Sequence, residues 1–293
     1  MNFPKVSVHI ITYNQRAFAG PAIESALAQD YPNLEVVVAD DASVDGTADL
    51  VREFETGNPG RVVAVLGETN LGLSGNGNRA LRACSGKYVA FMGGDDILLP
   101  GKISAQVQWL EVSSDRVLCA HQVEVFYDDG SRPPHPLSRR LPHGRGAEQI
   151  IRHQPFGAVS VMVRADRIPS HGFRAELPMV SDTMLWVEVV REDGCFGCVP
   201  GTLARYRRHD SNVSGDPFRY LGDVKRQFAI LESEFPEFRR VTQYAKTRRL
   251  WYDVGVNLMN AGRTSEAREK FAGAIRREPW FARAWVRLGQ TLL

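Results

Sequence analysis

The sequence has no hydrophobic run long enough to cross a bilayer. Its first apolar run covers only residues 6–11, whereas a membrane-spanning helix needs about 20 apolar residues. No basic segment or small-residue cleavage site marks this run as a secretory leader. We therefore expect a cytoplasmic protein without a transmembrane segment.

Cysteine is scarce, with four residues in 293, which excludes a disulfide framework for a chain of this length. Cys195 and Cys198 form a single CxxC, without a second pair or a suitably spaced histidine nearby. A structural zinc site needs four ligands. We interpret these cysteines as reduced thiols in a strand and turn.

A strong excess of one charge is also missing. The net charge is +2, which disfavours a dedicated nucleic-acid binder. Residues 1–200 hold 18 Lys and Arg against 24 Asp and Glu, whereas residues 201–293 hold 18 against 10. The basic C-terminal part indicates either contact with a membrane surface or an acidic partner, or simply a set of solvated arginine-rich helices.

The glycine-rich turn of dinucleotide-binding proteins is absent. The first predicted strand is followed by Thr12-Tyr13-Asn14-Gln15-Arg16 instead of a G-x-G-x-x-G turn. A dinucleotide-binding dehydrogenase is therefore disfavoured, although the order of strands and helices alone would permit one.

What is present is a regular alternation of strand and helix. Apolar β-branched runs predict strands over 6–11, 34–39, 62–66 and 87–92, with helices over 17–29, 47–55 and 74–84 between them. This order predicts an α/β fold with a doubly wound, mostly parallel sheet and helices on both faces, and ligands at the carboxyl ends of the strands. The second half is less regular. There we expect a helix over 100–112, a long loop over 128–157, a strand over 158–163 and a helix over 182–191.

The C-terminal part changes to a helical pattern. Trp251 and Gly255 recur as Trp285 and Gly289, an offset of 34 residues that is typical of tetratricopeptide repeats. We therefore expect an all-α C-terminal extension containing one repeat and the first helix of another. Because so few repeats do not stand alone, these helices dock on the rest of the chain or on another subunit, or belong to a longer array, which we favour.

The predicted domains are an α/β domain over 1–215, a helical linker over 216–247 and tetratricopeptide-like helices over 248–293. The α/β domain divides into a first half over 1–112 and a second half over 113–215. The terminal helices are candidates for binding a protein partner or for self-association.

Two adjacent acids follow the fourth predicted strand. Asp95 and Asp96 come directly after an apolar run and two glycines, Gly93 and Gly94. At the carboxyl edge of a sheet these carboxylates would bind Mg²⁺ or Mn²⁺, which prefer oxygen ligands. The alternative interpretation is that one of them caps the helix that begins near Pro100.

The chain resembles the inverting family-2 glycosyltransferases of GT-A fold over roughly residues 3–215. The resemblance rests on ordered blocks at residues 6–14, 38–47, 70–78, 83–88 and 91–96. It implies that the following residues bind the nucleotide-sugar: Thr12, Tyr13, Asn14, Asp40, Asp41, Asn78, Gly94 and Asp95. Asp41 is the better candidate for contact with the base, with Asp40 supporting it. The resemblance also implies a Mn²⁺ or Mg²⁺ cofactor on Asp95, Asp96 and His209. The chain departs from the family at Gly93, often an aspartate, and at Gly77, often an arginine.

The second half of the chain matches the family's acceptor side. The resemblance is carried by residues 156–164, 172–173 and 181–186, and it implies that Asp182 is the catalytic base. A carboxylate suits that role because the attacking hydroxyl must lose its proton. Asp182 could instead be only a helix N-cap. Residues 205–214 include three arginines and His209, and only one or two of these arginines can point inward.

The resemblance implies a hexosyltransferase-like enzyme, with a nucleotide-sugar half over 1–112 and an acceptor half over 113–215. It would move a sugar with inversion from a nucleotide diphosphate-sugar to a hydroxyl of a glycan or lipid-linked acceptor, in polysaccharide or glycoconjugate synthesis. The alternative is a catalytically silent scaffold that acts through its helical repeats. The intact acids Asp41, Asp95, Asp96 and Asp182 argue against the scaffold.

Overall fold

The computed structural model describes residues 3–138, 141–154, 156–191, 193–209 and 217–292. The chain divides into two compact units. The first comprises residues 1–150 and 154–212, and the second comprises residues 151–153 and 213–293. The predicted domain boundaries at residues 112, 215 and 247 remain predictions.

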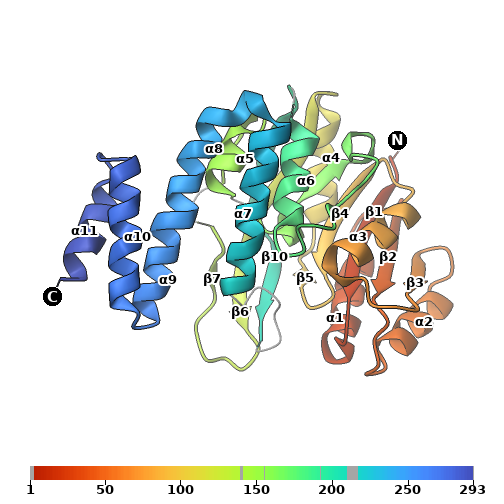
Figure 1. Ribbon diagram of the computed structural model, residues 1–293. Helices are drawn as coiled ribbons and strands as arrows, with labels where there is room; N and C mark the ends of the chain where they lie inside the picture. The colour runs from red at the N-terminus through yellow and green to blue at the C-terminus, as the bar shows by residue number, and fades with distance from the viewer. Residues whose placement is uncertain (1–2, 139–140, 155, 192, 210–216, 293) are drawn as a thin grey trace. The chain divides into compact units, whose positions relative to one another are not determined.

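A ten-stranded sheet runs through the first unit (Figure 1), in the order β3-β2-β1-β4-β9-β6-β10-β5, with β7 paired to β6 and β8 to β10. Its strands are β1 (Val6–Thr12), β2 (Leu34–Asp40), β3 (Val62–Leu66), β4 (Tyr88–Gly93), β5 (Ile97–Leu98), β6 (Arg116–Tyr127), β7 (His135–Pro136), β8 (Gly144–Arg145), β9 (Met162–Arg164) and β10 (Cys195–Arg208). Strands β1 to β4 pair only in parallel with one another. Beyond them the sheet is mixed, since β9 is antiparallel to both β4 and β6.

Helices cover both faces of the parallel part, as predicted. Val36 and Val38 of β2 join the core cluster that includes α1, α2 and α4 residues, whereas Val37 and Ala39 pack with Ala80 of α3. This alternation follows from the two-residue period of a strand, and it makes β2 buried along its whole length. The helices are α1 (Arg16–Leu27), α2 (Thr47–Gly57), α3 (Gly72–Ala83), α4 (Lys102–Glu111), α5 (Glu148–His153) and α6 (Ser181–Val190).

The structure corrects two expectations for the second half of the sheet. The predicted loop over 128–157 contains β7, β8 and α5. The long strand β6 was not predicted, because its polar residues obscure the apolar pattern although it lies between β9 and β10. The predicted strand over 158–163 forms a short 3₁₀ turn (Ala158–Ser160) before β9 begins at Met162.

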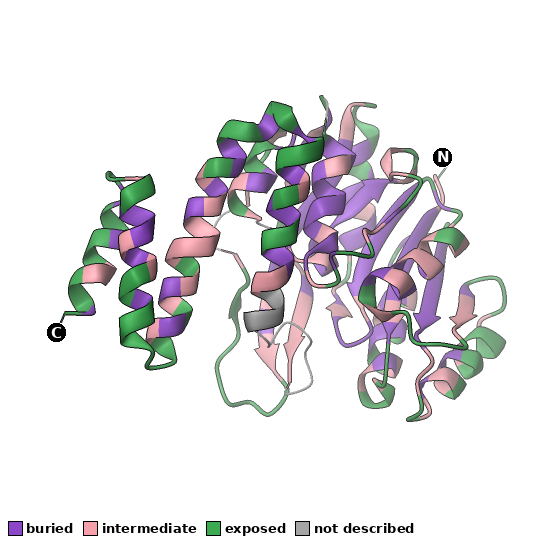
Figure 2. Ribbon diagram, in the orientation of Figure 1, coloured by how far each residue is buried: buried purple, intermediate pink, exposed green. Residues whose placement is uncertain are grey.

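The described part of the second unit is all-helical. Its helices are α7 (Pro217–Glu234), α8 (Arg239–Lys246), the π-helical segment η5 (Thr247–Asp253), α9 (Val254–Asn260), α10 (Thr264–Arg277) and α11 (Ala282–Gln290). Figure 2 shows buried positions along α9 and α10 and a largely exposed α11. The all-α extension is thus observed, whereas its assignment as a tetratricopeptide repeat remains a prediction. No described helix is both long and apolar enough to cross a membrane.

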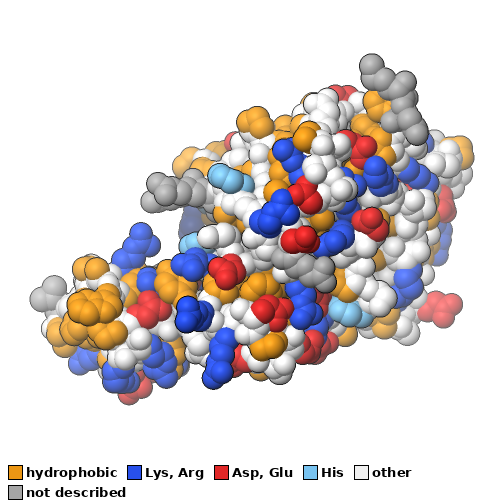
Figure 3. Space-filling model, turned by 90° about the horizontal axis from the view of Figure 1, so that it is seen from above, with side chains coloured by type: hydrophobic (Ala, Val, Ile, Leu, Met, Phe, Trp, Pro, Cys, Tyr) orange, Lys and Arg blue, Asp and Glu red, His pale blue; other side chains and the backbone are white. Residues whose placement is uncertain are grey.

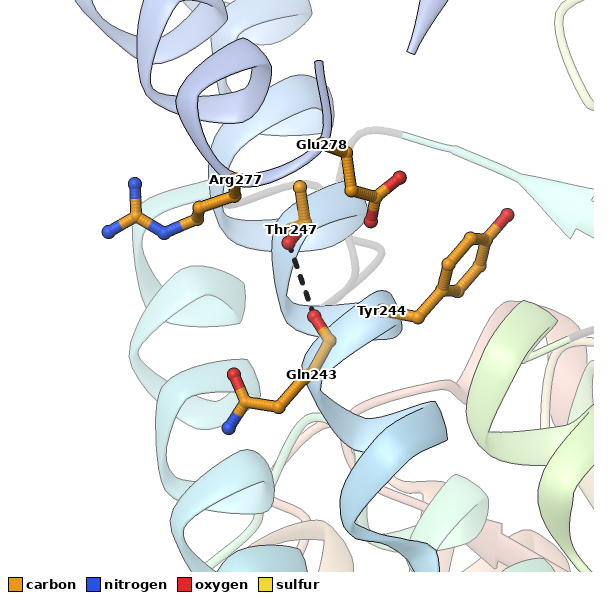
Figure 4. A pocket seen from close by; sticks show the side chains of 5 residues that line it. All are labelled: Gln243, Tyr244, Thr247, Arg277 and Glu278. Carbon is orange, nitrogen blue, oxygen red and sulfur yellow. Dashed lines mark hydrogen bonds between the residues drawn. The ribbon is translucent and has the colours of Figure 1, made fainter. Parts of the chain in front are cut away.

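Small residues allow the helices of this unit to approach closely. A Cβ atom at Gly255 would lie 2.7 Å from the ring of Phe271, and one at Gly273 would overlap the ring of Trp251. These two contacts bring η5 and α9 against α10. A separate hollow of ≈ 420 Å³ is lined by Gln243, Tyr244, Thr247, Arg277 and Glu278 (Figure 4). None of the predicted site residues lines it.

Candidate active site

Three predicted motifs converge at one edge of the sheet. Thr12 at the end of β1 is in register with Asp40 at the end of β2, and Ile11 is in register with Gly93 at the end of β4. Because parallel strands place their carboxyl ends at the same edge, the segments after β1, β2 and β4 lie side by side. The predicted site therefore assembles from parts far apart in the sequence.

The segments after β1 and β2 are locked together by Asn14 and Ser43. The Asn14 backbone N–H donates to Ser43 Oγ at 2.8 Å, and Asn14 Oδ1 accepts from the Val44 N–H at 2.9 Å. Ser43 Oγ in turn donates to Asp40 Oδ1 at 2.5 Å. These bonds give Asn14 and Asp40 a structural role, and they leave the Tyr13 side chain 48% exposed at the edge.

Asp41 is held inside the same edge. Its two carboxylate oxygens accept from the backbone N–H groups of Leu71 and Gly72, each at 2.8 Å, at the start of α3. The Arg79 guanidinium adds an ion pair at 3.2 Å. Unpaired N–H groups at a helix N-terminus favour a carboxylate. The structure thus assigns Asp41 a positioning role, and its contact with a nucleotide base stays a prediction.

Asn78 connects α3 to a turn in the second half of the chain. Its side chain donates to the Phe173 carbonyl at 2.8 Å and accepts from the Phe173 N–H at 2.7 Å. A Cβ atom at Gly77 would lie 2.8 Å from the Phe173 ring, so the glycine is required by packing. The polar groups of the Asn78 amide are engaged in this contact, and its predicted nucleotide contact stays a prediction.

The acidic pair meets His209 at the end of β10. His209 Nε2 lies 3.0 Å from Asp95 Oδ2, and the imidazole stacks on the Phe18 ring at a centroid distance of 4.5 Å and an interplanar angle of 26°. The two side chains come from segments 114 residues apart. The tertiary structure therefore brings together two of the three predicted metal ligands.

Asp96 is turned toward β10 instead. Its Oδ1 accepts from the Arg207 backbone N–H at 3.2 Å. Burial, together with the negative charge of Asp95, raises the pKa of Asp96 well above its usual value. Among the described residues no group of three His, Cys, Asp or Glu side chains is placed to hold a metal ion. The predicted ligand set of Asp95, Asp96 and His209 stays a prediction, and in this structure the Asp96 carboxyl group is engaged by the neighbouring strand.

Arg207 is a site residue that sequence reasoning did not single out. Its Nε donates to the Asp95 carbonyl at 2.9 Å, and its guanidinium pairs with Asp128. The guanidinium also lies over the Phe18 ring at 5.1 Å. Arg207 thus ties the acidic turn to β6 and α1. Arg205 and Arg207 lie over the same Phe126 ring, and only the position along β10 determined that Arg207, rather than Arg205, contacts the acids.

The Asp95–His209 pair suits a divalent cation. Mg²⁺ is commonly bound by one or two protein ligands together with phosphate oxygens and water, and Mn²⁺ accepts imidazole as well as carboxylate. Close by, Thr12 Oγ1 is buried and has no hydrogen-bond partner among the described residues. A Cβ atom at Gly94 would lie 3.0 Å from that oxygen and 2.7 Å from Gln15 Oε1. Gly94 therefore brings the backbone close to Thr12, and Gln15 becomes a further site candidate.

Asp182 lies in the first turn of α6, and Val180 is the N-cap residue. Its Oδ1 accepts from the Thr183 N–H at 2.6 Å, and burial raises the pKa of Asp182 to about 6. One helical turn later, Trp186 packs edge-on against Phe91 of β4 at 4.9 Å. Helix α6 therefore lies against the strand that leads to the acidic pair. No described hydrogen bond joins Asp182 to Asp95 or Asp96, so its role as the catalytic base stays a prediction.

The sequence profile described as Glycosyl transferase family 2 matches residues 7–165 of the chain. That span includes β1, β2, β4 and the acidic pair, and it covers more than half of the chain. The chain belongs to glycosyl transferase family 2. The family assignment agrees with the resemblance inferred from the sequence blocks.

Individual relatives share a quarter to a third of their aligned residues with this chain. An uncharacterized protein of Mycobacterium tuberculosis is 32% identical over 215 residues, which is 71% of this chain and 60% of that protein. The chain thus spans about three fifths of the length of this relative. The Escherichia coli UDP-Glc:alpha-D-GlcNAc-diphosphoundecaprenol beta-1,3-glucosyltransferase WfgD is 24% identical over 227 residues, covering 77% of this chain and 85% of that protein.

Solved structures share the fold. The crystal structure of Staphylococcus aureus TarS 1–349 in complex with UDP-GlcNAc has a TM-score of 0.66 at 17% identity, covering 98% of this chain and 89% of that one. The mannosyltransferase PcManGT from Pyrobaculum calidifontis, in complex with GDP-Man and Mn²⁺, has a TM-score of 0.65 at 20% identity, covering 100% and 81%. At these identities the likeness establishes the α/β fold alone.

Proposed function

We propose that the protein is a glycosyltransferase that moves a sugar from a nucleotide diphosphate-sugar to an acceptor hydroxyl with inversion. The observation that carries this proposal is the Asp95–His209 pair, at the edge where the segments after β1, β2 and β4 converge. Family membership supports the class of reaction. The name of the Escherichia coli relative WfgD describes a glucosyltransferase that acts on a diphosphoundecaprenol-linked sugar. This supports a lipid-linked acceptor in polysaccharide synthesis.

We assign the following roles to the residues of this site. Tyr13 packs on the nucleotide, and Thr12 and Gly94 contact the donor along the sheet edge. Asp95 and His209 would hold Mn²⁺ or Mg²⁺, which when bound would offset the negative charge of the diphosphate leaving group. Asp182 accepts the proton of the acceptor hydroxyl as that oxygen attacks the anomeric carbon and the bond from this carbon to the diphosphate breaks. A pKa of about 6 keeps most of this carboxyl group ionised at neutral pH.

The test is turnover with three donors: UDP-glucose, UDP-GlcNAc and GDP-mannose. Each is incubated with Mn²⁺ and a GlcNAc-diphospholipid acceptor, and the anomeric configuration of the product is read by NMR. We expect transfer from one donor with inverted configuration. A retained configuration would refute the single-displacement mechanism, and no turnover with any nucleotide-sugar would favour the silent scaffold that acts through its helices.

A further inference from the structure

The last helix presents two apolar faces. Ala284 and Thr291 of its inner face are buried against the rest of the helical unit. A second stripe consists of Trp285, Val286, Gly289 and Leu292, whose three side chains are 53%, 62% and 67% exposed. Nothing lies within 4 Å of a Cβ atom built at Gly289. We call these four residues the α11 stripe.

The stripe has a covered counterpart in the same unit. Subtracting 34 from each position gives Trp251, Tyr252, Gly255 and Leu258, and α10 packs on these residues. The Trp251 ring lies over Gly273, and the Phe271 ring fills the space over Gly255 and lies 5.9 Å from the Tyr252 ring. The same pattern of large and small residues is thus buried once and exposed once.

We propose that the α11 stripe is the docking surface for one more amphipathic helix with the chemistry of α10. Such a helix places an aromatic side chain over Gly289 and a small residue over Trp285, repeating the Phe271 and Gly273 contacts. The docked helix continues the interface that α10 already forms with α9 and α11.

The charged residues beside the α11 stripe indicate which charge the docked helix carries next to its apolar face. Arg283 and Arg287 line a hollow together with Val286 of the stripe and Tyr252. The 34-residue offset aligns Arg283 with Arg249 and Arg287 with Asp253, so α11 is more basic on this flank than its covered counterpart. Hydrophobic side chains gather at this end of the molecule beside Lys and Arg (Figure 3). The occupant therefore carries acidic residues beside its apolar face.

A second copy of the chain fits this surface less well. Two α11 helices facing each other would bring together the same arginines, which repel. A nine-residue helix also offers much less than the ~800 Å² that each partner of a stable dimer buries. The inference does not depend on glycosyl transfer, so it can fail while the proposed function holds.

The first test supplies the helix in trans. A fluorescein-labelled peptide of residues 260–278 is titrated into the full chain and followed by anisotropy. We expect saturable binding that Gly289→Trp weakens at least about tenfold, because the new side chain fills the open position. Arg276→Ala, a change at an exposed residue of α10, is the matched control and leaves binding unchanged. Binding that Gly289→Trp leaves unchanged would overturn the proposal.

The second test removes the need for the free peptide to fold. The same segment is fused directly after Leu293, which preserves the 34-residue offset, and amide hydrogen exchange is measured over residues 282–292. We expect exchange to slow at least about tenfold, but not with a fused copy that carries Phe271→Asp. Equal protection by both copies, or by neither, contradicts the proposal. Two other results would also contradict the proposal. One is that the unextended chain forms a dimer, and the other is that it binds phosphatidylglycerol vesicles, if Gly289→Trp or Trp285→Ser abolishes that association.

Discussion

His209 Nε2 and Asp95 Oδ2 meet at 3.0 Å although the residues are 114 positions apart. The contact joins the turn after β4 to the end of β10, and the Phe18 ring of α1 stacks on the imidazole ring. An imidazole and a carboxylate at this separation can share a cation between them.

Replacing His209 tests this pair. His209→Ala removes one of the two proposed metal ligands, so we expect the concentration of Mn²⁺ required for half-maximal transfer to rise by about 10- to 100-fold. We expect the maximal rate at saturating Mn²⁺ to change by a smaller factor than this Mn²⁺ requirement. His135→Ala, at an exposed position of β7, is the control and changes neither quantity. An unchanged Mn²⁺ dependence of His209→Ala would remove His209 from the metal site.

Arg207 tests the support of the acidic turn. Arg207→Lys keeps the charge but loses the planar guanidinium group that contacts the Asp95 carbonyl and the Asp128 carboxylate at the same time. We expect kcat/KM for the donor to fall about tenfold while the far-ultraviolet circular dichroism spectrum is preserved. Arg208→Lys is the matched control, since the Arg208 guanidinium lies over Tyr206. Equal losses in the two variants would count against a specific role for Arg207.

If Asp182 is the catalytic base, as proposed, the rate of transfer depends on pH. Only its ionised form can accept a proton, and its pKa is raised to about 6. We therefore expect kcat to rise as pH increases through about 6 and then to level off. Asp182→Asn should abolish transfer and leave donor affinity within about twofold, as measured by calorimetry. Asp166→Asn, at an exposed position, serves as the control. Near-normal turnover of Asp182→Asn would assign the base elsewhere.

Asp41 is expected to matter for stability as well as for binding. Asp41→Ala leaves two helix N-terminal N–H groups and the Arg79 guanidinium without their buried acceptor. We expect the free energy of unfolding to fall by about 3 kcal/mol, measured by urea denaturation. Asp49→Ala, a change at an exposed acid in the first turn of α2, changes it by less than about 0.5 kcal/mol. A small loss for Asp41→Ala would mean that the residue is free to serve the nucleotide.

Lys102 gives the folded state its own pH dependence. The side chain is fully buried and donates to Gln106 Oε1 at 2.5 Å, and burial lowers the pKa of Lys102 to about 7. Between this value and the ordinary lysine pKa the unfolded chain binds more protons, so stability increases as pH rises above 7. We expect Lys102→Met to flatten this increase between pH 7 and pH 9 in urea denaturation. Lys225→Met, at an exposed position, keeps the wild-type slope, and equal slopes in both variants would refute the prediction.

Much of the donor side could be predicted from short segments. The strands that became β1 to β4 are continuous apolar runs, because a parallel strand covered on both faces needs apolar residues at every position. Residues 38–47 and 91–96 follow such runs directly, so their place at the carboxyl edge followed from local pattern alone. Strand β6 could not be predicted in the same way, because polar residues such as Gln122 and Glu124 interrupt its apolar run.

The sequence by itself determined the α/β class, the family and the edge of the sheet where acids gather, because these depend on local periodicity and on ordered motifs. Only the tertiary structure decided which groups those acids contact. It turned Asp96 toward the Arg207 backbone, placed Asp41 on the N-terminus of α3, and joined Asp95 to His209. Each of these contacts depends on strand register and helix packing between distant segments, which no local pattern encodes.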